Sequence, residues 1–410
     1  MKEVLVLGAG YAGLKAVRNL QKEVGDNAHI TLVDMNDYHY EATELHEVAA
    51  GSVDKSKITY PIKDVLNNKV KFIQDKVVKV DADKKTVELK NSGQLRYDYC
   101  VLALGFVSET FGIKGALDNA LQMTDIDQAV AIHEHIVETM KKYRETQDKE
   151  YLNIVVCGAG FTGIELAGAL VDERPKYAKL AGVDESEISI TIVEAATKLL
   201  PMFSENLANY GVSLVKSLGV KIMTGCMIKE IQDGRVMYAT QDNEELQAVP
   251  GKTIIWTTGV SGSPVMGESG FKERRGRVIV NDNLLDPDHD DLYIIGDVSA
   301  LMDKATDRPY PTTAQIATRM GAYVGHAIAQ RLKGEVPEPF SYNSLGTVAS
   351  VGNTHAFGLV GKKEYKGFPA SFVKKMIMNK SLADIGGAKE LKVVSTYITR
   401  INDKRAISLR

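Results

Sequence analysis

The sequence predicts an α/β fold made of two similar units, because one phrase of strand, glycine turn and helix occurs twice in its 410 residues. The first copy is "LVLGAGYAGLKAV", near the N-terminus, and the second is "VVCGAGFTGIELAG", 150 residues later. In each copy a later apolar strand ends in an acidic residue. Strands that alternate with helices favour a parallel sheet with helices on its faces.

The first copy has the spacing of a dinucleotide-binding turn. An apolar strand over 4–7 enters G-x-G-x-x-G, a helix continues to about Lys22, and a strand over 30–33 is followed by Asp34. The glycines permit a tight turn, close approach of a pyrophosphate and helix–strand packing, and the acid accepts hydrogen bonds from a ribose. The helix N-terminus adds free N–H groups for phosphate. The predicted binding residues of this copy are Gly8, Gly10, Tyr11, Ala12, Gly13 and Asp34.

The second copy repeats the unit with a longer insertion. Its strands cover 154–157 and 188–193, and Glu194 follows the second strand. A carboxylate there repels a 2′-phosphate and favours NAD over NADP, although Lys198 lies close enough in sequence to weaken the repulsion. Two sites suggest one flavin and one nicotinamide; the alternative is a duplicated fold with one inactive site. The predicted binding residues of this copy are Gly158, Gly160, Phe161, Thr162, Gly163 and Glu194.

Further apolar strands are predicted after the two units, and each is followed by a turn that contains glycine. Strands over 99–106 and 253–260 occupy matching places after each unit, and a third over 291–301 carries Gly296-Asp297. Ligands of parallel α/β sheets bind beyond the carboxyl ends of the strands, where these turns are expected. We therefore expect Asp297 to bind a ligand, with simple capping of the next helix as the alternative.

Composition excludes several function classes. Apolar residues make up 44% and charged residues 25%, which is ordinary for a globular protein, and the net charge of −3 gives no reason to expect nucleic acid. Residues 362–410 carry twelve Lys/Arg and four Asp/Glu, which is either a solvated face or a surface for anionic lipid. The three cysteines form no C-x-x-C pair and have no metal-ligand spacing, so we expect neither thiol–disulfide chemistry nor a metal. No stretch of 18 apolar residues and no secretory signal is present, so we expect no membrane-spanning helix.

Together these features resemble flavoproteins with two dinucleotide-binding domains, and among them the type II NADH dehydrogenases, which are single-subunit, non-pumping NADH:quinone oxidoreductases. The resemblance covers about residues 1–387. Its specific stretches are "NDYHYEATELHE", "VLALGFVSETFGIKG", "GAGFTGIE", "VEAATKLLPMFSE", "IIGDVSA", "PYPTTAQIA" and "FVKKMIMNKSLADIGG".

The resemblance implies that FAD binds first along the chain and NADH second. To the first glycine turn it adds FAD-binding positions on other segments, which are Met35, Val77, Ala103, Gly105, Gly296, Asp297, Ala314, Gln315 and Lys374. To the second turn it adds NADH-binding positions, which are Thr258 and Gly259.

Glu165, for which the first copy has Lys15, is implied to act near the nicotinamide and the flavin. Its carboxylate would accept the carboxamide N–H and orient the ring, and it would also relay a proton to quinone. We expect burial to raise its pKa toward that task. The alternative is an acid of the first helical turn that only meets the helix dipole.

Gln315 is implied to donate to a quinone carbonyl. The family pattern A-Q-x-A-x-Q is matched at its first glutamine, but the second position is Arg319. The alternative is a surface glutamine on a helix that Thr312 or Thr313 caps.

Lys374 is implied to lie near the flavin, and a surface lysine is the alternative. Its apolar neighbours are expected to form one stripe of a helix over about 370–381, and the two lysines another. The chain beyond Gly387 has strand-like character and no clear amphipathic helix.

The expected organisation is two Rossmann-like domains with a small C-terminal, membrane-facing module. The segments are 1–115 and 280–330 for the FAD domain, 116–279 for the NADH domain, and 331–410 for the module, which begins with a hairpin. NADH would reduce FAD by hydride transfer, and two electrons would pass to a menaquinone-like quinone at the cytoplasmic side of the cell membrane. The protein would be peripheral there and would pump no protons, and a homodimer is allowed.

Other functions remain open. A soluble NADH oxidase or diaphorase would use the same scaffold. Peroxide reductases and sulfide:quinone reductases need redox cysteines, which "YHYEATELHE" does not supply. A redox-responsive binding protein that acts through the unusual tail is a non-enzymatic alternative.

Overall fold

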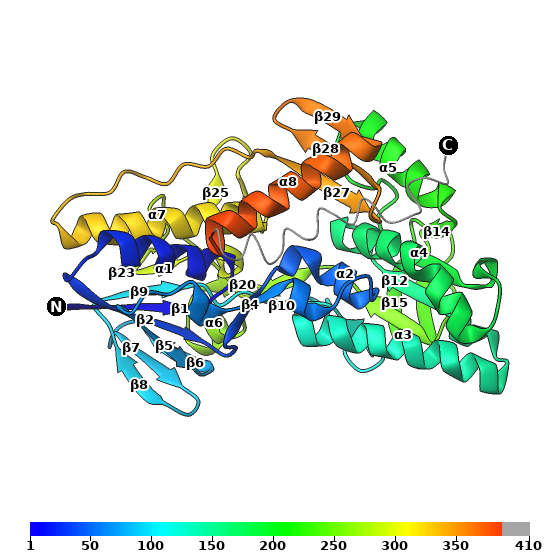
Figure 1. The fold of residues 1–410 in the computed structure, drawn as a ribbon, viewed down its shortest axis with the longest axis horizontal. Helices are drawn as coiled ribbons and strands as arrows, with labels where there is room; N and C mark the ends of the chain where they lie inside the picture. The colour runs from blue at the N-terminus through cyan, green and yellow to red at the C-terminus, as the bar shows by residue number, and fades with distance from the viewer. Residues whose placement is uncertain (388–410) are drawn as a thin grey trace.

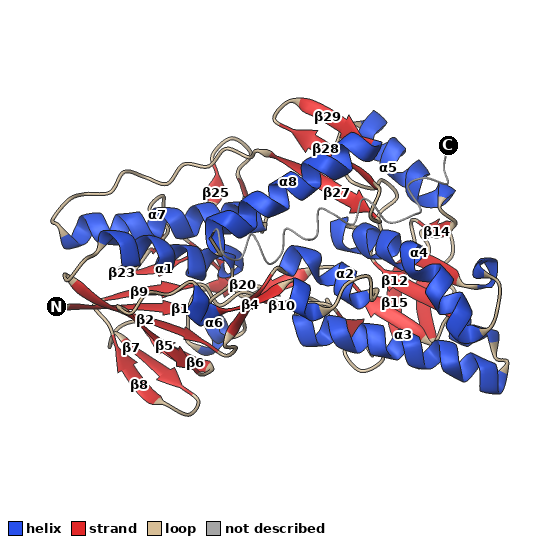
Figure 2. Ribbon diagram, in the orientation of Figure 1, coloured by secondary structure: helices blue, strands red, loops and turns tan. Residues whose placement is uncertain are grey.

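Two parallel β-sheets flanked by helices carry the two copies of the repeated unit (Figure 1, Figure 2). The computed structural model describes residues 1–387, so the strand-like segment expected after Gly387 lies outside the described residues. Within 1–387, no helix has the length and the hydropathy needed to cross a membrane.

The first sheet has the order β22-β23-β9-β1-β2-β5. All its pairs are parallel except β22 with β23. Its strands are β1 (Lys2–Leu7), β2 (Ala28–Asp34), β5 (Val70–Gln74), β9 (Tyr99–Leu102), β22 (Leu285–Asp286) and β23 (His289–Ile294). The central strands are almost wholly apolar because helices cover the sheet, which leaves no solvent face for alternation.

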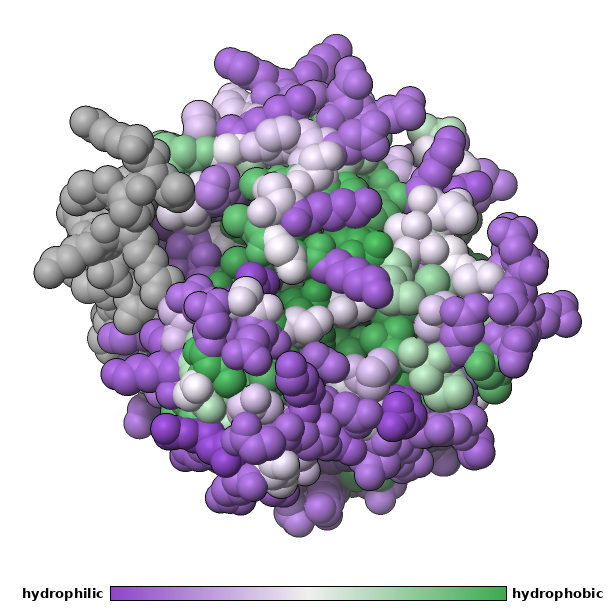
Figure 3. Space-filling model, turned by 90° about the vertical axis from the view of Figure 1, so that its right-hand side faces the viewer, coloured by the Kyte–Doolittle hydropathy of each residue, from purple (hydrophilic) through white to green (hydrophobic). Residues whose placement is uncertain are grey.

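The second sheet has the order β11-β18-β12-β13-β14, with every pair parallel. Its strands are β11 (Leu121–Gln122), β12 (Asn153–Cys157), β13 (Ser189–Val193), β14 (Val220–Met223) and β18 (Thr253–Trp256). The helices of this unit are α3 (Ile126–Thr146), α4 (Phe161–Ala181) and α5 (Glu205–Ser217). Figure 3 views this end of the molecule, where apolar side chains gather at the centre and hydrophilic ones surround them.

Smaller sheets decorate both units. They are β3 (Tyr38–Tyr40) with β4 (Thr59–Pro61); β6 (Val77–Asp81) with β7 (Thr86–Leu89) and β8 (Gly93–Arg96); β15 (Met227–Gln232) with β16 (Arg235–Ala239) and β17 (Gln247–Pro250); β20 (Glu273–Arg274) with β21 (Arg277–Ile279) and β24 (Ser299–Ala300); and β25 (Met302–Asp303) with β26 (Arg308–Pro309).

Two short antiparallel strands, β10 (Phe106–Ser108) and β19 (Val260–Gly262), carry the chain between the units. The strand expected over 99–106 is therefore broken by a turn after β9. Beyond β19, Val265 and Met266 of α6 (Val265–Glu268) pack in the first hydrophobic core, and α6 contacts β6. From the sequence we expected residues up to 279 to belong to the second domain. By its packing, the chain instead rejoins the first unit at about residue 263.

One helix of the first segment belongs by packing to the second unit. Leu45 and Val48 of α2 (Leu45–Ala49) lie in the second hydrophobic core, together with residues of α3 and α4. The Tyr177 hydroxyl of α4 donates to the carbonyl of Ala50 at 2.6 Å. The two units are therefore joined by core packing as well as by the crossing strands.

The expected C-terminal hairpin is present as β27 (Gly346–Val351) and β28 (His355–Val360), and β29 (Lys363–Lys366) extends it. It lies against α4, where a Cβ at Gly168 would overlap the backbone of Gly352. Helix α8 (Gly367–Ile385) then runs from this sheet to α1 and so spans both units (Figure 1).

Helices α1 (Tyr11–Glu23) and α7 (Ala314–Leu332) make the most extensive helix–helix contact of the described chain. Small residues allow it: a Cβ at Gly321 would overlap the carbonyl oxygen of Ala12, and one at Gly325 would crowd Ala16. This packing holds the N-terminal end of α7 over the first unit.

We predict that Gly321→Ala lowers the free energy of unfolding by about 1–3 kcal/mol, because the added methyl group must push α7 away from α1. Thermal or urea denaturation measures the change. Gly267→Ala is the matched control, because its methyl group would meet only the flexible Glu273 side chain at 3.2 Å. Equal stability of the two variants would contradict the prediction.

Candidate functional site

The first glycine turn is shaped by packing at two glycines and is open at the third. Gly8 has φ +102°, and a Cβ there would overlap the carbonyl oxygen of Ala103. A Cβ at Gly13 would overlap the carbonyl oxygen of Gly8. A Cβ at Gly10 would meet no atom within 4 Å, so the backbone there borders open space. This is the cradle that a pyrophosphate requires.

The second turn has the same geometry. Gly158 has φ +109° and packs against Thr258, and a Cβ at Gly163 would overlap the carbonyl oxygen of Gly158. Gly160 again borders open space. The Thr258 hydroxyl is buried without a hydrogen-bond partner among the described residues, which fits a ligand at this turn. The remaining predicted positions of this copy, Phe161 and Thr162, begin α4 directly after the turn.

The two predicted ribose-binding acids each close the turn of their own copy. The Asp34 carboxylate accepts from the backbone N–H of Ala9 at 2.6 Å and of Asn36 at 2.8 Å. Glu194 accepts from Ala159 at 2.7 Å and Ala196 at 2.8 Å in the same way. Each carboxylate keeps further lone pairs for a ligand hydroxyl. The residues present therefore fit one dinucleotide at each turn.

Asp297 lies half-buried in the short turn that follows β23. Burial raises the pKa of this carboxyl to about 6, against the lowering influence of Arg277. No group within residues 1–387 hydrogen-bonds its carboxylate. Gly105, in the turn after β9, has φ +69° and open space beside it. Asp297 and Gly105 can therefore both border a ligand.

Behind the first turn lies a buried polar cluster that sequence analysis missed. His39 Nδ1 is 2.8 Å from the carbonyl oxygen of Ala9, and the Tyr11 hydroxyl donates to Glu41 at 2.8 Å. His39 Nε2 and Glu41 Oε1 are 3.7 Å apart. The signal in the sequence was "YHYE", whose polar residues are too closely spaced for a purely structural strand.

Glu165, on α4, contacts the C-terminal module. Its Oε1 accepts from Lys374 Nζ at 2.9 Å and from the backbone N–H and hydroxyl of Ser350 at 3.0 and 3.1 Å. Burial by itself would raise the pKa of Glu165, but the charges of Lys374 and His46 outweigh it and hold the pKa below its ordinary value. The expected upward shift is therefore wrong: a buried cation compensates the carboxylate.

Lys374 points inward from α8, and the apolar residues beside it point outward. The Lys374 side chain is only 15% exposed, and Glu165 raises its pKa despite burial. Phe372, Met376 and Ile377 are 50%, 53% and 41% exposed. The helix is therefore turned so that one lysine forms a buried ion pair while an apolar face meets the surroundings.

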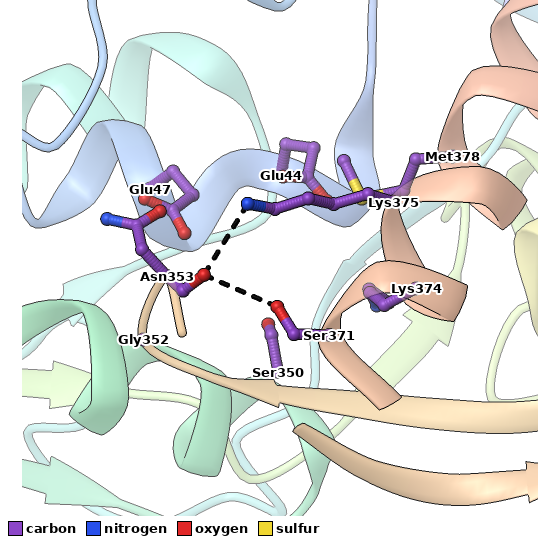
Figure 4. Close-up of a pocket in the computed structure, with 9 residues that line it drawn as sticks. All are labelled: Glu44, Glu47, Ser350, Gly352, Asn353, Ser371, Lys374, Lys375 and Met378. Carbon is purple, nitrogen blue, oxygen red and sulfur yellow. Dashed lines mark hydrogen bonds between the residues drawn. The ribbon is translucent and has the colours of Figure 1, made fainter. Parts of the chain in front are cut away.

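Lys374 of this ion pair lines a small, partly open pocket (Figure 4). Elements η1 (Ala42–Glu44), α2, β27 and α8 supply its lining, which is Glu44, Glu47, Ser350, Gly352, Asn353, Ser371, Lys374, Lys375 and Met378. Lys375 Nζ reaches the carbonyl oxygen of Asn353 at 3.4 Å. The pocket thus lies between the segment of η1 and α2 and the C-terminal module.

Three ionisable residues beside the pocket were not predicted from the sequence. Burial raises the pKa of Glu44 to about 8. Burial alone would lower the pKa of His46, but Glu47 and Glu165 raise it to about 9. His46 Nε2 lies 3.6 Å from Glu47, whose pKa falls below its ordinary value. The available signal was the run "ELHE" at the start of an otherwise apolar helix.

Gln315 is engaged by the segment that precedes β27. Its Oε1 accepts from the Tyr342 hydroxyl at 2.7 Å and the N–H of Leu345 at 2.9 Å, and its Nε2 lies 3.5 Å from the carbonyl oxygen of Gly346. Thr313 caps α7, and Arg319 is exposed. Since Gly346 and Ser350 belong to one strand, Gln315 and Glu165 contact β27 about 13 Å apart.

The remaining predicted positions make no contact that decides their role. Met35 is 62% exposed after β2, and Val77 is buried at the start of β6. Ala103 packs against the first turn, and Ala314 begins α7. Gly259 has φ +149° beside Phe111.

Comparison with known proteins agrees with this architecture. Residues 2–321 match the pyridine nucleotide-disulphide oxidoreductase family. A type II NADH:quinone oxidoreductase of Staphylococcus haemolyticus is 43% identical over 391 residues, which are 94% of this chain and 96% of that protein. One of Staphylococcus aureus is 42% identical with the same coverage.

Solved structures show the same fold at low sequence identity. NDH2 from Plasmodium falciparum in complex with NADH superposes with a TM-score of 0.85 at 19% identity, over 96% of this chain and 97% of that one. The sulfide:quinone oxidoreductase of Aquifex aeolicus superposes with a TM-score of 0.76 at 20% identity, over 97% and 96%. With the family match and the relatives above 40% identity, the chain belongs to the type II NADH:quinone oxidoreductases within the pyridine nucleotide-disulphide oxidoreductases.

Proposed function

We propose that this protein oxidises NADH and reduces a membrane quinone, with FAD held non-covalently at the first glycine turn and NADH at the second. The observation that carries the proposal is the pair of equivalent turns, each closed by an acid and each open at its middle glycine. FAD would supply the step between hydride transfer and the two-electron reduction of a menaquinone-like acceptor. The proposed reaction includes no proton-pumping step.

Glu165 is proposed to orient the nicotinamide and to relay a proton toward quinone. Its carboxylate follows the second turn on α4, and Lys374 together with Ser350 holds it in one orientation. A fixed carboxylate can accept an amide N–H and set which face of the ring is presented. Because the lowered pKa keeps Glu165 ionised, any proton that it passes must first reach it from another group.

The outer face of α8 is proposed to bind the cytoplasmic side of the cell membrane. Phe368, Phe372, Met376 and Ile377 are exposed there, and Lys380 is exposed nearby. Apolar side chains beside cations suit an interface with anionic lipid. The homodimer stays a prediction.

A soluble NADH oxidase or diaphorase is the second candidate. The contact of Gln315 Nε2 with the carbonyl oxygen of Gly346 at 3.5 Å favours it, because Nε2 is the donor that would meet a quinone carbonyl. Redox thiol chemistry is not part of either proposal, since Cys100, Cys157 and Cys226 are buried and burial raises the pKa of each.

The two candidates differ in their electron acceptor. We expect the FAD-loaded protein to oxidise NADH rapidly with a soluble menaquinone analogue in the absence of oxygen, and to consume oxygen slowly without quinone. Absorbance at the NADH band and an oxygen electrode give both rates. Rapid oxygen consumption with little response to quinone would instead assign the chain to the oxidases.

Matched substitutions at the two open glycines separate the two nucleotide sites. We predict that Gly10→Val yields protein without bound flavin, and that Gly160→Val keeps flavin but raises the KM for NADH about 10- to 100-fold, the equivalent of one or two lost hydrogen bonds to a charged group. Neither added side chain has an immediate steric neighbour at its Cβ, so both should fold. Flavin absorbance and steady-state kinetics are the measurements. Loss of flavin from Gly160→Val alone would reverse the assignment of the sites.

Substitutions at Gln315 and Tyr342 test whether Gln315 contacts quinone or only supports the structure. We predict that Gln315→Leu raises the KM for quinone about 10-fold, the cost of one hydrogen bond, and leaves the KM for NADH unchanged. Tyr342→Phe removes a bond to the same amide and should leave both values unchanged. If Tyr342→Phe raises the KM for quinone as much as Gln315→Leu does, Gln315 acts only by fastening α7 to β27.

A further inference from the structure

A strained and exposed aromatic residue lies beside the second nucleotide unit and has no part in the proposed function. Phe111 follows β10, which Figure 1 labels between the two units. Its φ is +52°, a left-handed conformation that is uncommon for a bulky residue, and 57% of its surface is exposed. Within residues 1–387 it belongs to none of the hydrophobic core clusters. A strained backbone that serves no packing role points to a function.

Two other segments hold Phe111 in this conformation through Glu109. One oxygen of the Glu109 carboxylate accepts from the backbone N–H of Phe111 at 2.7 Å. Its other oxygen accepts from the Ser261 hydroxyl of β19 at 2.6 Å and from Arg275 Nε, between β20 and β21, at 2.9 Å. The donation from Ser261 and these further donors hold the pKa of Glu109 below its ordinary value, so the carboxylate stays charged. The Arg275 guanidinium also lies over the phenyl ring, 5.0 Å from its centroid.

The edge of the Phe111 ring faces the turn that follows β18. A Cβ at Gly259 would lie 3.4 Å from Cζ of Phe111, so the missing side chain of the glycine leaves room for the ring. The backbone N–H of Glu109 donates to the carbonyl of Gly259 at 3.0 Å, and Trp256 Nε1 donates to the carbonyl of Glu109 at 2.9 Å. The segment that carries Phe111 is therefore docked on the carboxyl end of β18.

The topology of the second sheet indicates which half of a dinucleotide would lie at this end of β18. The strand order reverses at β12, which has β13 on one side and β18 on the other. A dinucleotide lies across such a reversal, beyond the carboxyl ends of the strands. Glu194, which follows β13, fits the ribose of the adenosine half. The nicotinamide half is therefore left for the β18 side, where the Thr258 hydroxyl is buried without a hydrogen-bond partner in the described part of the chain.

We propose that the ring of Phe111 packs against the nicotinamide half of bound NADH and so contributes to the affinity of the second site. This inference rests on the proposed function and adds a binding residue to it. Burial of exposed aromatic surface against a ligand is favourable. Because Arg275 already holds one face of the ring, little side-chain freedom is lost when the ligand binds. The strained conformation at Phe111 is retained because it aims the ring at Gly259.

Three substitutions at Phe111 separate the ring from the backbone strain. Phe111→Ala removes the ring and keeps a Cβ in the left-handed conformation, Phe111→Asn removes the ring and suits that conformation, and Phe111→Tyr keeps the ring. We expect the Ala and Asn variants of the FAD-loaded protein to bind NAD⁺ about 10-fold more weakly, which is what one aromatic contact contributes. Phe111→Tyr should bind NAD⁺ like the wild type. Isothermal titration calorimetry measures the affinities, and Phe111→Asn should denature at a higher temperature than Phe111→Ala.

Titration with ADP tests which half of the dinucleotide the ring contacts. ADP carries the adenosine and the two phosphates but no nicotinamide riboside, and FAD already fills the first site. Its affinity should therefore be the same for the wild type and the three variants. Leu117→Ala is the matched control, because Leu117 is another exposed apolar residue, at 66% exposure, six positions along the chain. It should change the affinity for neither NAD⁺ nor ADP.

The outcomes distinguish this inference from the proposed function. Unchanged NAD⁺ affinity in both Phe111→Ala and Phe111→Asn would overturn the inference. Equal weakening of NAD⁺ and ADP would also overturn it, because the substitution would then distort the whole site. If the FAD-loaded wild type binds neither NAD⁺ nor NADH, the proposed function itself fails, whatever the variants do.

Discussion

The buried ion pair between Glu165 and Lys374 is the contact on which the arrangement of the site depends. Removing two charges from water is costly, and the pair is tolerated because the two donors of Ser350 also bind the carboxylate. The pair fastens α8 to α4 and, through Ser350, to β27. It therefore fixes the C-terminal module against the second unit and forms one wall of the pocket. Because Lys374 must point inward, the apolar side chains of α8 are left on its outer face.

The two copies of the repeated unit hold the same helix at two places. In the second copy Glu165 binds Lys374 of α8, and at the corresponding position of the first copy Lys15 donates to the carbonyl of Asp384 at 3.1 Å. Arg18 donates to the same carbonyl at 3.0 Å. Cations suit this end of α8 because carbonyl groups and the negative end of the helix dipole lie there. The two contacts are ten residues apart, about 15 Å along the helix. The acidic Glu165 thus binds a lysine in the middle of α8, and the basic Lys15 binds a carbonyl group at its C-terminal end.

The charges of the Glu165–Lys374 ion pair also affect the ionisable groups around the pocket. The cation of Lys374 keeps Glu165 ionised, and the ionised Glu165 in turn helps to keep His46 protonated. Glu44 lines the same pocket, and burial raises its pKa to about 8. Glu44 with a raised pKa, Glu47 with a lowered pKa and the buried cation of Lys374 therefore line one pocket. Each of these states follows from its neighbours and not from the residue type alone.

The sequence by itself determined the two nucleotide-binding units, because glycine spacing and strand periodicity are local properties that only one backbone geometry satisfies. Gly8, Gly10 and Gly13, and their counterparts in the second copy, have the conformations and the open space that their order predicts. Only the tertiary structure decided the pKa of Glu165, the engagement of Gln315 by Tyr342, the inward turn of Lys374 and the assembly around Glu44. Each of these depends on a partner more than 25 residues away in the chain, and burial and charge compensation arise only when such partners meet. The return of the chain to the first core near residue 263 has the same origin, since the packing of α6 against β6 leaves no local mark in the sequence.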